Sequence, residues 1–201
     1  NGKDSDGTSN NKACGPTVPH DFVVIKAGTQ NTGKTFADAS NQYTGPNGVK
    51  LYPLSGAEFA IYNANPNADA NATVVKTLTQ ATATDGYYWS VNDLNIGTMY
   101  WLVETKAPAG HSLLPKPIAF TLTASRGSGS GTTVELADDL KDSAKWAKSA
   151  VQAFSSEATA SSLPGSPAQG FMVGQTRKAT ILVKDTEVGQ LPKAGSTGIY
   201  P

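Results

Sequence analysis

The 201-residue chain carries 16 basic and 16 acidic side chains, so its formal net charge is zero. This balance, with no basic cluster longer than Arg177-Lys178, argues against a nucleic-acid-binding protein, which usually presents a basic stripe. The single cysteine, Cys14, excludes an internal disulfide bond. Cys14 is either a reactive thiol or, as we favour, an incidental residue of a polar leader. No segment is long and apolar enough to span a bilayer, and we expect the chain to be a fragment of a longer precursor.

Short segments rich in aromatic and β-branched residues recur along the chain, separated by turns that contain glycine or proline. Residues 1–19 precede them as an expected leader or interdomain linker, and residues 29–50 are expected to form a loop. The regular spacing predicts an all-β domain, a β-sandwich, over residues 20–188. The predicted strands are 20–28, 54–64, 72–83, 87–94, 99–105, 116–124 and 178–185.

Residues 125–173 break this pattern. Apolar residues recur there at steps of three and four, which predicts an amphipathic helix at about 136–157. Flexible segments rich in glycine, serine and proline flank it, so we interpret 125–173 as an insertion between the last two strands. The helix would cover a sheet edge or an open end of the sandwich; a helix that docks a partner is the alternative. The apolar positions are Leu136, Leu140, Ala144, Ala147, Val151 and Phe154.

Three ionisable residues lie inside or directly after apolar strand segments: Lys26 in "FVVIKAG", Glu104 in "YWLVETK" and Asp185 in "TILVKD". Taken singly, a lysine at a strand end usually extends to water, and an aspartate there usually begins a turn. Taken together they are more informative. First and last strands of a sandwich are often neighbours, so Lys26 and Asp185 could meet, with Glu104 approaching from a central strand.

Burial of such a set changes its chemistry. Desolvation lowers the pKa of an amine and raises that of a carboxyl group. A neutral amine is a nucleophile, and a neutral carboxyl group is a better electrophile than a carboxylate. With Glu104 handling protons, Lys26 and Asp185 would form an amide and release water. This bond would close a loop of 159 residues (185 − 26), worth on the order of 5 kcal/mol by the loop-entropy model used for disulfides.

The same residues resemble a known family. "LSGAEFAIY" (54–62) is similar to the L-x-GAxFxLY strand of Cna protein B-type (CnaB) domains from Gram-positive pilins and adhesins. "YWLVETKAPAGHSL" (100–113) is similar to the pilin E-box, with His111 in the usual tyrosine place. The resemblance implies a reverse immunoglobulin-like sandwich with an autocatalytic isopeptide bond that links Lys26 to Asp185, with Glu104 as the catalytic acid. Most pilin members have asparagine at the acceptor position, so the leaving group here would be water rather than ammonia.

"LPKAGSTG" (191–198) looks like an LPxTG sortase signal and falls within an expected sorting segment, residues 189–201. Its five positions are Leu191, Pro192, Lys193, Ala194 and Gly195. Ala194 replaces the usual threonine, and the apolar span and basic tail that should follow are missing, in keeping with a fragment. The resemblance implies cleavage between Ala194 and Gly195 and transfer to a neighbouring pilin or to cell-wall peptidoglycan.

The expected function is therefore structural: a subunit of a sortase-assembled pilus (fimbria), secreted and covalently anchored to a Gram-positive cell wall. Its partners would be sortase, other pilin subunits and peptidoglycan. The alternative is an adhesin domain that binds a host surface ligand or a partner cell through its loops. An enzyme is disfavoured, because His20 and His111 are too few for a triad or a metal site, and no cofactor is expected.

Overall fold

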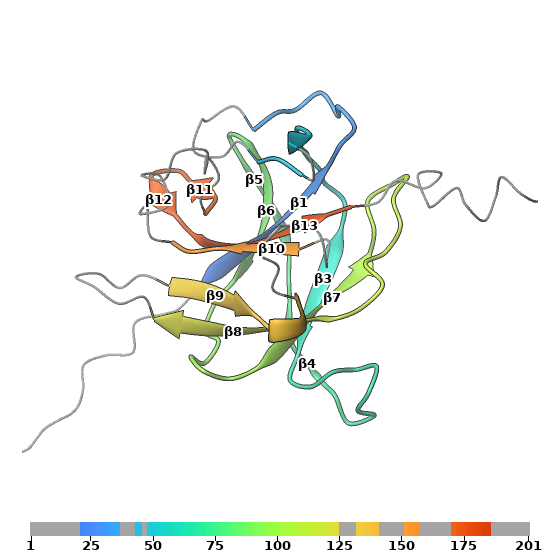
Figure 1. Ribbon diagram of the computed structural model, residues 1–201, viewed down its shortest axis with the longest axis vertical. Coiled ribbons are helices and arrows are strands. Elements are labelled where there is room, and N and C mark those ends of the chain that lie inside the picture. Colours follow the sequence, from blue (N-terminus) through green and yellow to red (C-terminus); the bar gives the residue numbers. More distant parts are fainter. Residues whose placement is uncertain are drawn as a thin grey trace, which may run out of the picture.

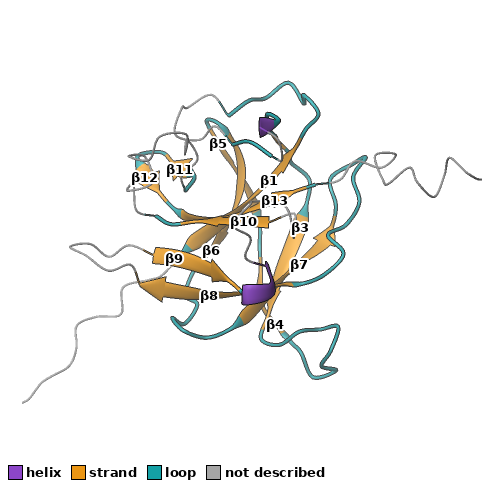
Figure 2. Ribbon diagram, in the orientation of Figure 1, coloured by secondary structure: helices purple, strands orange, loops and turns teal. Residues whose placement is uncertain are grey.

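The structure, a computed structural model, describes residues 21–36, 43–45, 48–124, 132–140, 151–156 and 170–185. Two β-sheets pack face to face in this part of the chain (Figure 1). Strands dominate the described residues, and helix is confined to single short turns such as Asp138–Leu140 (Figure 2). The predicted all-β sandwich is confirmed. In the described residues, no helix has the length and apolar character needed to cross a membrane.

The first sheet has six strands in the order β10-β13-β1-β6-β5, with β2 also paired to β1. Strands β1 and β13 run parallel, and every other pairing in this sheet is antiparallel. The predicted pairing of the first and last strands is thus confirmed. The bounds are β1 (Phe22–Gly28), β2 (Tyr52–Pro53), β5 (Gln80–Ala83), β6 (Gly86–Val91), β10 (Val151–Phe154) and β13 (Ala179–Lys184).

The second sheet has five strands, all antiparallel, in the order β4-β3-β7-β8-β9. A small separate hairpin, β11 and β12, precedes β13 in the chain. The bounds are β3 (Glu58–Tyr62), β4 (Val74–Thr77), β7 (Tyr100–Lys106), β8 (Ile118–Ala124), β9 (Thr132–Leu136), β11 (Met172–Val173) and β12 (Thr176–Arg177).

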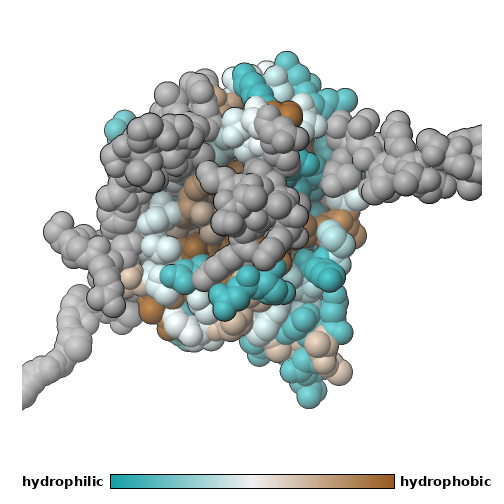
Figure 3. Space-filling model, viewed as in Figure 1, coloured by the Kyte–Doolittle hydropathy of each residue, from teal (hydrophilic) through white to brown (hydrophobic). Residues whose placement is uncertain are grey.

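Alternation of buried and less buried side chains defines the inner face of the second sheet. In β7, β8 and β9 every second residue is buried, as expected for strands with one face against a core. Phe120 of β8 contacts Phe22 of β1 with ring centroids 5.1 Å apart, so the aromatic residues of the two sheets interlock. In the space-filling view, the described surface is mostly teal and white, and brown residues are a minority on this face (Figure 3).

Strand β1 is buried on both faces, and this explains its continuous apolar sequence. Its outward-facing residues, including Val23 and Ile25, pack in a second apolar cluster with Phe36, Leu51 and Phe171. These last three residues come from segments outside the two sheets. The region 29–50, predicted to be a loop, therefore contributes Phe36 and Tyr43 to this second apolar cluster.

The predicted strand at 72–83 is two strands in different sheets. β4 lies at the edge of the second sheet and β5 at the edge of the first. The chain crosses between them at Leu78, whose N–H donates to the Phe59 carbonyl at 3.0 Å and whose side chain is buried in the core. Strand-forming residues recur throughout 72–83, so the sequence does not reveal that the chain passes from one sheet to the other at Leu78.

The predicted helix at about 136–157 is wrong at both ends. Leu136 closes strand β9, and Val151–Phe154 form β10, which pairs with β13; residues 141–150 lie outside the described residues. The β-branched sequence Thr132-Thr133-Val134 alternates at the period of a strand, and pairing with β8 outweighs the helical spacing of the apolar residues that follow. Residues 125–173 are thus no insertion, because they supply a strand to each sheet.

Replacement of Leu51 by alanine tests the second cluster. Leu51 is 1% exposed, so Leu51→Ala should lower the free energy of unfolding by about 2–5 kcal/mol in denaturant titration. Leu113→Ala is the matched control, because Leu113 is 52% exposed and its replacement should cost less than about 0.5 kcal/mol. Equal effects of the two replacements would mean that Leu51 is not packed on the sheet.

Candidate functional site

Lys26, Glu104 and Asp185 lie together between the two sheets. Lys26 comes from β1, Asp185 directly follows the neighbouring β13, and Glu104 comes from β7 of the opposite sheet. Because side chains alternate along a strand, each continues the row of inward-facing core residues that precedes it. The preceding members of the three rows are Val24, Leu102 and Val183.

The lysine amine contacts both carboxyl groups. Lys26 Nζ donates a hydrogen bond to Asp185 Oδ1 and lies 3.0 Å from Glu104 Oε2. The three residues are only 1%, 4% and 4% exposed, respectively. An unpartnered charge would be very costly at this depth, and the mutual contacts offset that cost. The sequence-based prediction that these three residues meet agrees with this geometry.

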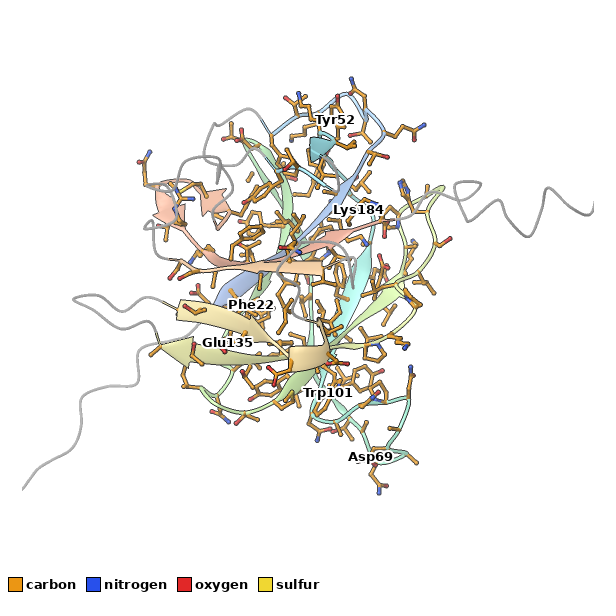
Figure 4. All side chains as sticks on the ribbon, viewed as in Figure 1. Phe22, Tyr52, Asp69, Trp101, Glu135 and Lys184 are labelled. Carbon is orange, nitrogen blue, oxygen red and sulfur yellow. The ribbon has the colours of Figure 1, made fainter. Side chains whose placement is uncertain are left out.

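Backbone hydrogen bonds hold the groups in place. The Asp185 N–H donates to the Ala27 carbonyl at 2.8 Å, which extends the parallel pairing of β1 and β13 by one residue. The Leu114 N–H donates to Glu104 Oε1 at 2.7 Å. One carboxylate oxygen of Glu104 is thereby held by the backbone, and the other, Oε2, is directed to Lys26. In Figure 4, labelled Lys184 and Phe22 mark opposite ends of this strand pair, and the site lies at the Lys184 end.

Aromatic side chains surround the set with apolar material. Lys26 Nζ lies 5.9 Å from the centroid of the Phe59 ring, and Phe59 is the cross-strand neighbour of Glu104. The Phe59 ring packs edge-on against Trp89 at 5.2 Å, and the Trp89 indole N–H donates to the Ala57 carbonyl at 3.1 Å. Electrostatic interactions are strengthened in such a water-poor environment.

Burial raises the pKa of both carboxyl groups above the ordinary values, 4.5 for Glu104 and 3.8 for Asp185. For Glu104, desolvation is the largest effect, attraction to Lys26 opposes it, and the charge of Asp185 adds to it. For Asp185, desolvation again outweighs the opposing attraction to Lys26. The raised pKa values mean that burial disfavours the charged form of both carboxyl groups.

His111 is a member of this neighbourhood that the sequence interpretation missed. In the sequence, its departure from the E-box tyrosine is the signal that could have pointed to it. Its Nε2 atom would lie 3.5 Å from a Cβ placed on Gly28, the residue after Ala27. Its charge also interacts with the Asp185 carboxyl group and lowers the pKa of that group.

Other sequence-based candidates lie outside the described residues. These are Cys14, His20 and the sortase-like segment Leu191–Gly195, whose roles stay predictions. Across the ranges that the structure describes, no group of three histidine, cysteine, aspartate or glutamate side chains is arranged to hold a metal ion.

Residues 47–137 match the family model of the SpaA prealbumin-like fold domain. The matched region spans the whole second sheet together with β2, β5 and β6, and it includes Glu104 but neither Lys26 nor Asp185. The match supports a fold of the type found in Gram-positive pilins, and this domain occurs in pilin subunits. No curated protein matches the chain.

The raised carboxyl pKa values predict how the stability of an unlinked form depends on pH. In a Lys26→Met variant both carboxyl groups stay buried and lose the attraction that lowered their pKa values, so both pKa values stay raised. A raised carboxyl pKa favours folding while the proton is bound. The free energy of unfolding should therefore fall as pH rises from about 4, by at most about 1.4 kcal/mol per pH unit for each group.

Urea titrations of this variant between pH 4 and pH 8 measure the dependence. A Lys26→Met/Glu104→Gln/Asp185→Asn variant, which lacks all three titrating groups, should show a much flatter profile. If stability instead increased with pH in Lys26→Met, the assignment of raised pKa values would be wrong.

Proposed function

We propose that this domain is a structural subunit of a sortase-assembled pilus, stabilised by an autocatalytic isopeptide bond between Lys26 and Asp185. The observation that carries the proposal is the buried contact of Lys26 with both carboxyl groups, one on the neighbouring strand and one on the opposite sheet. An ordinary buried ion pair has no need of a third ionisable group. The match of residues 47–137 to a domain of pilin subunits supports the same role independently.

The proposed reaction is a condensation. A proton passes from Lys26 Nζ to Asp185, which leaves a neutral amine, a neutral carboxyl group and an ionised Glu104 with no change in net charge. Lys26 Nζ then attacks Asp185 Cγ, and Glu104 Oε2, 3.0 Å away, accepts the proton that the nitrogen must lose. With the proton of the neutral carboxyl group carried on Oδ2, the Cγ–Oδ2 bond breaks and this oxygen leaves as water after it gains a second proton from a donor on its own side, while Glu104 keeps the proton that it took from nitrogen. The products are one amide and one water molecule.

The reaction turns over once, so the domain is no enzyme in the usual sense. The proposed bond would stabilise the domain because it covalently joins two residues that are 159 positions apart in the sequence. A crosslink over such a loop is worth on the order of 5 kcal/mol in the loop-entropy model. Because the chain has a single cysteine and so no internal disulfide bond, the isopeptide bond would take the place of a disulfide as its covalent crosslink.

Anchoring is the second part of the proposal. We place it at "LPKAG", Leu191–Gly195, which follows shortly after Asp185 in the sequence. A sortase would cleave after Ala194 and transfer the new carboxyl end to a neighbouring subunit or to peptidoglycan. The protein would then be secreted and held on the cell wall.

Intact mass spectrometry tests the bond. The folded protein should weigh about 18 Da less than its sequence mass, because amide formation releases one water molecule. Glu104→Gln should restore the full mass, since the proton acceptor is lost while the side chain keeps its size, and thermal unfolding should occur at a lower temperature. Glu58→Gln is the matched control, because Glu58 lies exposed on β3 and should keep the deficit.

A full mass in the correctly folded wild-type protein would overturn the proposed bond. A deficit that persists in Glu104→Gln would remove Glu104 from the catalytic role while leaving the bond intact.

The sorting signal is tested separately with a purified sortase of a Gram-positive pilus system and a small amine nucleophile. The expected product ends at Ala194 and carries the nucleophile, as judged by mass. Ala194→Thr restores the usual motif and should be processed at least as fast, while Leu191→Ala should not be processed. Failure of both wild type and Ala194→Thr would argue against a sorting signal and favour the adhesin alternative.

A further inference from the structure

Two buried polar atoms beside the proposed bond have no hydrogen-bond partner among the described residues. A third buried atom at the site, Glu104 Oε2, also has no hydrogen-bond partner but lies 3.0 Å from Lys26 Nζ as an ion pair; the two that lack both are His111 Nε2 and Asp185 Oδ2. The other oxygen of Asp185 is occupied, since Oδ1 accepts from Lys26. Unpaired buried polar atoms are uncommon because each one costs free energy, and a catalytic role is one reason for such an atom to be retained.

The orientation of the imidazole assigns its protons. His111 Nδ1 lies 2.9 Å from the Ala109 carbonyl oxygen, which can only accept, so Nδ1 carries a hydrogen. The Nε2 atom therefore accepts when the ring is neutral and donates when the ring is protonated. The contact of Nδ1 with the Ala109 carbonyl orients the ring so that Nε2 points toward Gly28 of β1.

The inward atom lies in the neighbourhood of Asp185. Nε2 lies over the Gly28 backbone, and the adjacent Ala27 is held to Asp185 by a backbone hydrogen bond of 2.8 Å. The charges of His111 and Asp185 interact. The other ionisable groups at this place are Lys26 of β1, which repels an imidazolium, and Glu104 of β7, which attracts it. Lys184 of β13 also interacts with the Asp185 carboxyl group, but its side chain lies on the outer face of the sheet near Gly45.

The condensation leaves one proton unassigned. Glu104 Oε2 faces the amine and takes the proton from nitrogen, whereas the departing Oδ2 is the carboxyl oxygen that Lys26 does not contact. An oxygen leaves a tetrahedral intermediate readily only as water, so a donor is required on the Oδ2 side.

We propose that His111 is this donor, passing the Nε2 proton to Asp185 Oδ2 as the Cγ–Oδ2 bond breaks. The proposal rests on the proposed isopeptide bond. Before the step the set holds a neutral amine, a neutral Asp185 carboxyl group, ionised Glu104 and protonated His111. Afterwards it holds the amide, water, protonated Glu104 and neutral His111, so both protons and charge balance. The half-buried ring then regains a proton from solvent.

The experiment follows bond formation in the full chain during refolding. Protein from inclusion bodies is dissolved in denaturant, its full mass is verified, and it is diluted into native buffer at pH 6. Samples quenched over time report the fraction that has lost about 18 Da. His111→Ala should form the bond roughly a hundredfold more slowly than wild type, since a general acid contributes about 10²–10⁴-fold.

Two further measurements separate proton donation from packing. Added imidazole should accelerate the reaction of His111→Ala with increasing concentration and leave the wild type unchanged. His111→Gln, which fills the site and hydrogen-bonds without an acidic proton, should be as slow as His111→Ala. Circular dichroism verifies that each variant has folded.

The outcomes are distinct. A wild-type protein that folds and keeps its full mass overturns the isopeptide bond and this inference with it. A wild type that forms the bond no faster than His111→Ala overturns the inference alone. Slow His111→Ala without rescue by imidazole, or a fast His111→Gln, assigns His111 a packing role and likewise overturns proton donation.

Discussion

A lysine amine enclosed between two carboxyl groups in the interior of the sandwich is the interaction on which this domain depends. Removing one partner from such a set leaves an uncompensated buried charge, which costs about 3–5 kcal/mol. Condensation of Lys26 with Asp185 would remove the problem permanently, because two ionisable groups become one neutral amide. Desolvation raises the pKa of both carboxyl groups, and it would thereby favour condensation, which replaces charged groups by a neutral amide.

The topology gives such a bond a mechanical consequence. β1 and β13 are parallel neighbours, so the chain enters β1 at one end of the sheet and leaves β13 at the other. Tension on the two ends would load these strands in shear. With Lys26 joined to Asp185, force would pass along β1 to residue 26, cross the amide and leave at residue 185. Residues 27–184, which form nearly the whole sandwich, would carry none of it.

The sequence predicts the all-β fold class and the meeting of Lys26, Glu104 and Asp185, but it does not predict the order and partners of several strands. Lys26 and Glu104 each interrupt an apolar strand segment, and this local signal holds in the structure because both strands are buried where the two residues lie. The predicted helix at about 136–157 is wrong at both ends because apolar residues at helical spacing also fit the strands there, and only pairing with β8 and β13 decides between the two. The covering of β1 by Phe36 and Leu51 depends on contacts distant in sequence, which no local pattern encodes.

Two departures from the resembled family fall at adjoining places in the structure. Asp185 stands where asparagine is usual, and His111 stands where the E-box has tyrosine; the charges of the two side chains interact. In the intermediate formed from an asparagine acceptor, the amino group is basic enough to take up a proton and leave as ammonia. In the intermediate formed from a carboxyl acceptor, the hydroxyl group is far less basic and needs an acid in order to leave as water. A tyrosine hydroxyl is a weak acid near neutral pH, and an imidazolium is a far stronger one. The change of acceptor thus creates a need that the change at residue 111 is chemically able to meet.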